Sequence, residues 1–450
     1  MITIKTGAAR ALLAGATGLF LMNSGWAAIP IQQWTQPSGA KVFLVESPGI
    51  PMVDVQIDLD AGGRRDTADK VGLASLTASG TGNGVRAVGK EPALDENGLS
   101  EAWADLGASF GGSAGSDRMS FGLRSLTYPD ILARATALAA RQLAEPSYPE
   151  SVWLRDRAKL IASIKEANTR PATLAGRAYT QAVYGTHPYG FETTEATLNR
   201  ITVQDMRALH TRVVRPCGAK VSIVGALTRV QADALVTQLF ARLPAGTCAA
   251  QAAVPEVQPL QAATDQRIAF ASAQAHVLVG QPGYARSSPD HFALFVGNHI
   301  LGGGGFTSRL MTEVREKRGL TYGVSSSFSP GLHAGAFSIG LQTRPDQAEQ
   351  ALQLVREVLA KFVTEGPTEA ELQAAKDNLI GGFALRIDSN RKLLDNVANI
   401  AWVGLPLDYL DTWAQRVEKL TVDDIRAAFA RVLQPGKMVT VVLGAQDAAK

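Results

Sequence analysis

Two side chains that can donate hydrogen bonds stand seven residues apart in the segment REKRGLTY, namely Arg315 and Tyr322. The pattern around them predicts the end of an amphipathic helix, followed by the start of a strand. A guanidinium and a phenol in that arrangement can donate to a peptide carbonyl and to the oxyanion that develops when this carbonyl is attacked. The alternative is an ordinary surface helix on which Arg309, Arg315 and Arg318 are solvated.

The spacing of the histidines does not indicate a metal site. No histidine has another four positions later, and none belongs to a His-x-x-Glu-His pattern, which would place two imidazoles on one face of a helix. We therefore expect packing or surface roles for all six, which are His187, His210, His276, His291, His299 and His333.

Two other chemistries are only weakly indicated. The run Gly302–Gly305 lacks the Lys-Ser/Thr of a phosphate-binding loop and the spaced glycines of a dinucleotide site, so we interpret it as a flexible turn before a helix. The serines of LASLTASGTG, among them Ser75 and Ser79, belong to no Gly-x-Ser-x-Gly elbow and have no nearby His or Asp partner, which disfavours a serine hydrolase.

The N-terminus predicts export. Lys5 and Arg10 precede an apolar run of 12 residues, and SGWAA ends in small residues, as in a secretory signal peptide cleaved after Ala27. The apolar run is shorter than the ~20 residues that a spanning helix needs, so a membrane anchor is the weaker alternative. We expect an exported protein, periplasmic in the simplest case, without a transmembrane segment in its mature chain.

The two cysteines, Cys217 and Cys248, are 31 positions apart. In the oxidising compartment that a signal peptide implies they are candidate disulfide partners, with two buried free thiols as the alternative.

The charge balance is nearly neutral. Lys plus Arg number 44 against 41 Asp plus Glu, and no run of five like charges occurs. Charge therefore offers no case for nucleic acid binding.

An internal repeat divides the chain. The segment that starts at Ile201 and the one that starts at Leu420 share 10 identities in 26 positions at a constant offset of 219. Both predict a Thr-capped helix, a Pro-containing turn and an apolar strand. A second echo pairs the segments that start at Glu145 and Gly366. We infer a signal peptide at 1–27, a first module at 28–245, a linker rich in Ala, Pro and Gln at 246–262, and a second module at 263–450.

The order of elements within each module predicts the fold class. Alternating apolar strands come first, then long amphipathic helices, then a helix followed by a strand. Strands and helices that come in blocks indicate an α+β fold, and not a parallel doubly wound sheet. We expect two duplicated modules, each a mostly antiparallel sheet covered on one face by helices.

The strand VDVQIDLDAGGRRD followed by VGLASLTASGTGNG, together with REKRGLTY, resembles the M16 family of zinc peptidases, and the resemblance extends from about Ile29 to the end. In active members the helix after GLA carries His-x-x-Glu-His, which binds zinc and activates its water. The ligand positions correspond here to Ser75 and Ser79, and the Glu position to Ala78. A hydroxyl is a weak zinc ligand and alanine accepts no proton, so the resemblance implies that the metal site is lost.

The same resemblance assigns roles to other residues. The glutamate that completes the zinc site in active members corresponds to the neighbourhood of Asp156 or Glu166, either of which would be a third ligand without a first or second. Arg315 and Tyr322 correspond to the pair that faces the substrate across the cavity from zinc. HPYG, which begins at His187, matches a stretch common in the family and predicts a turn without a catalytic role.

Some M16 members work as two chains, one with zinc and one that supplies the other half of the cavity, and this chain resembles the second kind. The resemblance implies a non-catalytic, substrate-binding subunit that is inactive alone, holds no cofactor, and forms a heterodimer with a zinc-bearing M16-type chain to act on peptides. The alternative is a silent scaffold or binding protein of the same fold. A self-sufficient enzyme with another metal would need ligands that the sequence does not offer.

Overall fold

The computed structural model describes residues 29–444. The predicted signal peptide and the last six residues of the predicted second module lie outside the described residues. Within the described part, no helix is long and apolar enough to cross a bilayer.

The first module has a six-stranded sheet with the order β1-β2-β8-β3-β7-β6, in which β2 and β8 are parallel and the other neighbours antiparallel. Its strands are β1 (Gln32–Thr35), β2 (Lys41–Glu46), β3 (Met52–Leu59), β6 (Ser109–Ala114), β7 (Met119–Leu126) and β8 (Lys220–Gly225), beside a short pair β4 (Gly84–Val85) and β5 (Leu94–Asp95). Its helices are α1 (Leu73–Ser79), α2 (Glu96–Asp105), α3 (Pro129–Ala144), α4 (Glu150–Ala167), α5 (Pro171–Tyr184), α6 (Glu195–Arg200), α7 (Val203–Val213) and α8 (Arg229–Phe240).

The second module has a five-stranded sheet with the order β11-β12-β10-β13-β9. Its strands are β9 (Thr264–Ile268), β10 (Ala275–Pro282), β11 (Val324–Phe328), β12 (Ala336–Thr343) and β13 (Val439–Leu443). Its helices are α9 (His291–Asn298), α10 (Ala348–Glu365), α11 (Glu369–Gly381), α12 (Asn390–Val403), α13 (Tyr409–Glu418) and α14 (Val422–Val432).

The second sheet has the same topology as five of the six strands of the first, all but β1, which confirms the predicted duplication and the α+β fold. Read from its other edge, the second sheet is β9-β13-β10-β12-β11, which matches β2-β8-β3-β7-β6, including a single parallel pair in each. The repeated sequence folds as predicted: α7 and α14 both begin after a threonine that forms a capping box with an aspartate three residues later. Each helix then leads through a short turn into its strand, β8 or β13.

Each sheet has one face that packs on its own module's helices. In β3 the apolar residues Val53, Val55 and Ile57 are buried in the core that also contains α3 and α8. The alternate positions Asp54 and Asp58 point to the opposite face, because successive side chains of a strand alternate. That opposite face is polar, and a helix of the other module covers part of it.

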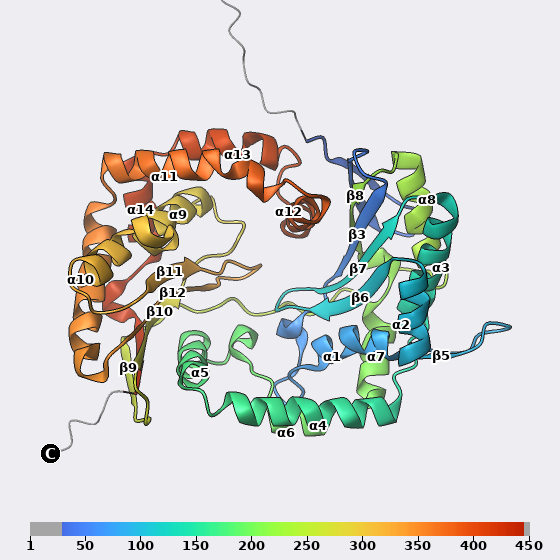
Figure 1. The fold of residues 1–450 in the computed structure, drawn as a ribbon, viewed down its shortest axis with the longest axis horizontal. Coiled ribbons are helices and arrows are strands. Elements are labelled where there is room, and N and C mark those ends of the chain that lie inside the picture. Colours follow the sequence, from blue (N-terminus) through green and yellow to red (C-terminus); the bar gives the residue numbers. More distant parts are fainter. Residues whose placement is uncertain (1–28, 445–450) are drawn as a thin grey trace, which may run out of the picture.

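The modules exchange one helix each (Figure 1). Helix α12 of the second module packs on β8 and β3, and α5 of the first module packs on β10 and β13. The two helices are equivalent, because each bound of α12 lies 219 positions after the corresponding bound of α5, the same offset as the sequence repeat. Each module therefore supplies the helix that packs on the second face of the other module's sheet.

Polar contacts hold the exchanged helices in place. Lys220 of β8 donates through Nζ to the carbonyl oxygens of Ala401 and Trp402, at 2.9 and 2.8 Å, and so caps the C-terminal end of α12. On the other side, the Tyr179 hydroxyl of α5 donates to the carbonyl oxygen of Phe337 at 2.5 Å. Because these donors and acceptors belong to different modules, the contacts fix how the modules sit together.

The connection between the modules is also tied down. Residues 247–263 form no helix or strand, and Cys248 near their start is joined by a disulfide to Cys217 in the turn before β8. Further along, the carbonyl oxygen of Pro255 is 2.9 Å from Nε2 of His187. HPYG forms a 3₁₀ turn, in which the Tyr189 hydroxyl donates to Asp117 at 2.5 Å.

We predict that Gly280→Ala destabilises the protein more than Gly340→Ala. A Cβ at 280 would collide with the Tyr179 hydroxyl of α5 and with the carbonyl oxygen of Phe337, whereas a Cβ at 340 would meet only the end of the Leu278 side chain, at 3.2 Å. We expect Gly280→Ala to lower the free energy of unfolding in urea by about 1–3 kcal/mol. Equal unfolding midpoints for the two variants would contradict the tight seating of α5.

Candidate functional site

Helix α1 carries the positions that correspond to the metal ligands. It begins after Gly72, whose backbone has φ +105°, and the Asp66 carboxylate accepts hydrogen bonds from the backbone nitrogens of Gly72 and Ala74. Ser75 and Ser79 are exposed and lie four positions apart on one face of the helix, whereas Ala78 is fully buried. The face that would carry two imidazoles in an active member therefore carries two hydroxyl groups.

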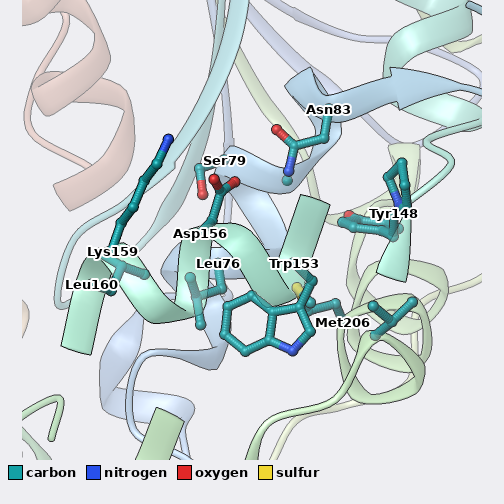
Figure 2. A pocket seen from close by; sticks show the side chains of 12 residues that line it. Leu76, Ser79, Asn83, Tyr148, Trp153, Asp156, Lys159, Leu160 and Met206 are labelled. Atoms are coloured by element: carbon teal, nitrogen blue, oxygen red, sulfur yellow. The ribbon is translucent and has the colours of Figure 1, made fainter. Parts of the chain in front are cut away.

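Helix α4 supplies a carboxylate opposite α1. Asp156 lines the same cavity as Ser79, and Figure 2 shows the Asp156 carboxylate and the Ser79 hydroxyl pointing into the same space. Glu166 is ten residues further along α4 and forms an exposed ion pair with Arg170 at 2.6 Å. Of the two candidates for the third ligand position, Asp156 is thus the one beside α1.

The donor set does not fit zinc. Asp156 could supply one carboxylate ligand, but the neutral hydroxyls of Ser75 and Ser79 are weak zinc ligands and leave the ion without the further strong donors that it needs. Across residues 29–444, no group of three or more His, Cys, Asp or Glu side chains could hold a metal ion. No step of zinc-assisted hydrolysis can be assigned to these residues.

Two histidines, the buried His210 and the half-buried His291, have polar partners of their own. Nε2 of His210 is 2.9 Å from the carbonyl oxygen of Leu143, and Nδ1 of His291 is 3.0 Å from the Tyr284 hydroxyl. Burial lowers the pKa of His210 to about 4 and that of His291 to about 3, so both are neutral at pH 7.

The segment that leads to Arg315 is irregular. His299–Gly303 and Met311–Glu316 are π-helical turns, a geometry that is rare and frequent at functional sites. The glycine run begins within the first of these turns and is closely packed there, because a Cβ at Gly302 would lie 2.5 Å from the backbone nitrogen of Ser326, whereas nothing lies within 4 Å of a Cβ at Gly305. Gly304 similarly abuts the carbonyl oxygen of His299. The packing fixes the start of the helical segment that carries Arg315.

The three arginines of this segment differ in their partners. Arg309 pairs with Glu371 at 2.6 Å and Arg318 with Glu313 at 2.9 Å. Arg315 takes part in none of the ion pairs within residues 29–444, and its guanidinium carbon lies 4.6 Å from the centre of the Phe306 ring. Phe306 is 65% exposed, so the stack lies at the surface with the charge of Arg315 unneutralised.

Tyr322 lies at a cavity of about 530 Å³ on the α5 side of the second sheet. Its side chain is 90% exposed, so its hydroxyl is accessible. The wall beside it is formed by His276 of β10, Gln342 of β12 and Ala175 of α5. Burial lowers the pKa of His276. Nothing in the sequence singled out His276, because its closeness to Tyr322 depends on the order of the strands.

The first module has an equivalent cavity of about 250 Å³ with different chemistry. Its wall includes Arg391 and Leu394 of α12, which lie 219 positions after Ala172 and Ala175 of the Tyr322 cavity. Here the buried Asp54 pairs with Arg124 at 3.1 Å, and desolvation raises the pKa of Asp54. The two cavities have therefore diverged, and only the second offers an exposed phenol.

The geometry so far defines a class of protein: two duplicated modules with exchanged helices, a metal position without metal ligands, and a half-buried Arg315 and an exposed Tyr322 in the second module. A sequence profile described as peptidase M16 inactive domain matches residues 200–379. A crystal structure described as the peptidase M16 inactive domain from Pseudomonas fluorescens is 34% identical, with a TM-score of 0.86 over 93% of this chain and 99% of that chain. The chain belongs to the peptidase M16 family.

Two curated relatives have names of different kinds, one as a protease and one as a non-peptidase. An uncharacterized zinc protease of Streptomyces coelicolor is 27% identical over 301 residues, which are 64% of this chain and 64% of the relative, so less than two thirds of that relative is matched. A protein of Helicobacter pylori named as the non-peptidase homolog YmxG is 23% identical over 390 residues, 85% of this chain and 87% of the relative. The similarity thus spans proteins named as proteases and as non-peptidases.

We predict that Ser75→His combined with Ser79→His creates zinc binding. The two imidazoles would share the exposed face of α1, with the Asp156 carboxylate beside the second one, which completes three ligands. Metal analysis after dialysis should find about one zinc per chain in the double variant. Ser75→His alone is the control and should hold none; zinc uptake no greater in the double variant than in this control would contradict the assignment of these positions.

Proposed function

We propose that this chain is the non-catalytic, substrate-binding subunit of an exported, two-chain M16-type zinc peptidase. It has no catalytic residues or cofactor of its own. A separate zinc-bearing chain supplies the metal and the general base in trans. This chain encloses an unfolded peptide and directs Arg315 and Tyr322 at the scissile carbonyl.

The proposal rests on the contrast between the first module and the second. The α1 face offers Ser75 and Ser79 where a metal would need imidazoles, while the second module keeps an unpaired guanidinium and an exposed phenol. An arginine without an acidic partner leaves its N–H groups free for a ligand. A scaffold would not need Arg315 to stay unpaired while its neighbours Arg309 and Arg318 are neutralised.

A peptide ligand suits the first sheet as well. Strand β6 lies at the edge of its sheet and pairs only with β7, so its outer backbone N–H and C=O groups can pair with an extended chain. Backbone pairing is independent of the ligand's side chains. It therefore suits peptides of varied sequence.

Export is part of the proposal. The predicted signal peptide addresses the chain out of the cytoplasm, in the simplest case to the periplasm. The disulfide between Cys217 and Cys248 suits such an oxidising compartment.

The second candidate is a silent scaffold or binding protein of the same fold. The relative named as a non-peptidase homolog favours it, because the match to that protein spans 85% of this chain. The two candidates differ in one requirement. A peptidase subunit needs a companion chain with an intact His-x-x-Glu-His motif, which a scaffold does not.

The test is peptide hydrolysis by the purified mature chain, alone and mixed with a zinc-bearing M16 chain encoded beside it. We expect the chain alone to be inert and the mixture to be active. Arg315→Ala and Tyr322→Phe should lower the kcat of the mixture by roughly 10²-fold, the typical cost of losing one oxyanion donor. Arg318→Ala is the matched control and should leave the rate unchanged, since Glu313 already neutralises Arg318.

Other outcomes would count against the proposal. Hydrolysis by the chain alone, with stoichiometric zinc, would mean that it carries a metal site of its own. Activity of the mixture that is equally insensitive to Arg315→Ala and Arg318→Ala would remove the role of Arg315. No activity in any mixture would favour the scaffold.

A further inference from the structure

A cavity of about 310 Å³ lies where α4 crosses the end of α1, beside the lost metal position (Figure 2). Its floor is apolar and buried: Trp153 is 5% exposed, and Tyr148, Val203 and Met206 are similarly covered. Leu76 and Leu160 extend the apolar wall toward the opening. The volume is at the lower end of the roughly 300–1,000 Å³ of small-molecule sites, so the cavity suits a ligand no larger than a few residues.

The wall of this cavity is held rigidly. Tyr148 has φ +43°, an uncommon conformation for a residue other than glycine, and its hydroxyl donates to the carbonyl oxygen of Thr77 in α1 at 2.8 Å. The ring also meets His210 edge to face, with centroids 5.9 Å apart. The aromatic wall is therefore pre-formed and does not depend on a ligand.

One side of the cavity is charged. Asp156 accepts a hydrogen bond from Nε of Arg155 through Oδ1 alone, at 2.8 Å, which leaves Oδ2 for a further donor. Lys159, one turn later on the same helix, is in none of the ion pairs formed within residues 29–444. Ser79 at the end of α1 and Asn83 in the turn that follows add neutral polar groups to the lining. A carboxylate and an ammonium thus stand together beside an apolar floor.

We propose that this cavity binds an amino acid with a bulky apolar side chain, either free or as the first residue of a peptide. The Asp156 carboxylate, with the Ser79 hydroxyl, accepts hydrogen bonds from the α-ammonium group. Lys159 donates to the carboxylate or carbonyl oxygen one carbon away. The side chain packs on Trp153, Leu76 and Met206. The site is complete within this chain, so it does not depend on the partner subunit proposed above.

Asp156 and Lys159 should discriminate among ligands by their charged groups. Isothermal titration calorimetry on the mature chain tests this discrimination. L-Leucine and L-leucinamide both keep the ammonium group and the side chain, so both should bind. N-Acetyl-L-leucine lacks the ammonium group and glycine lacks the side chain. The dissociation constant of each should be at least tenfold higher than that of leucine, which corresponds to a loss of about 1.4 kcal/mol in binding free energy. Leucyl-glycyl-glycine separates the two sources: binding equal to that of leucine indicates a peptide N-terminus, and weaker binding a free amino acid.

Variants locate the binding in this cavity. Asp156→Asn should weaken leucine binding at least tenfold, while Glu166→Gln, an exposed carboxylate further along α4, should not change it. Lys159→Gln should weaken the binding of leucine more than that of leucinamide, because only leucine carries a carboxylate. Ser79→Leu places an apolar side chain in the opening and should abolish binding, with an unchanged thermal unfolding midpoint because Ser79 is exposed.

Three results would overturn the proposal. The first is that neither leucine nor phenylalanine shows saturable binding at concentrations up to about 10 mM, which would mean a binding free energy weaker than about 3 kcal/mol. The second is binding of N-acetyl-L-leucine as tight as that of leucine. The third is leucine binding that Asp156→Asn and Ser79→Leu leave unchanged, since it would then occur elsewhere on the chain.

Discussion

The reciprocal exchange of α5 and α12 is the constraint on which the rest of the structure depends. Each sheet packs one face on its own module's helices, and the exchanged helix of the other module packs on its second face. The exchanged helix covers only part of that second face, and the uncovered parts are the Tyr322 cavity and its charged counterpart in the first module. Without the exchange, Lys220 would lose the two carbonyl oxygens of α12 to which it donates, and the Tyr179 hydroxyl would lose the carbonyl oxygen of Phe337.

The two modules show what duplication preserved and what it changed. The capping boxes, the strand order and the helix positions recur at one constant offset. The side chains at the candidate sites do not recur: α1 carries the hydroxyl groups of Ser75 and Ser79, and the second module carries the half-buried Arg315 and the exposed Tyr322. The cavity beside α1 has walls from both α1 and α4, and its lining includes Ser79 and Asp156.

Local patterns in the sequence were sufficient for the repeat, the alternating strand β3 and the placement of Ser75 and Ser79 on one helix face, because each depends on residues close in the chain. They could not decide between Asp156 and Glu166. These are ten positions apart on α4, which separates them by about 15 Å along the axis and turns them to different faces. Only the crossing of α4 over α1 brings Asp156 to the cavity.

Other features depend on contacts between distant segments. The stacking of Arg315 on Phe306 and the closeness of His276 to Tyr322 follow from the packed glycine run and from the strand order, neither of which a periodicity reveals. Within the glycine run, the tight approach of the Ser326 backbone explains why glycine is required at position 302. The exchange of α5 and α12 likewise has no signature in either helix alone.

The central claim is that this chain recognises peptides without a metal, through its second module. The most direct measurement is the equilibrium binding of an unstructured, fluorescently labelled peptide to the purified mature chain, with and without a zinc chelator. The account predicts saturable binding that the chelator leaves unchanged and that Arg315→Ala weakens. Absence of binding, or binding that the chelator abolishes, would contradict it.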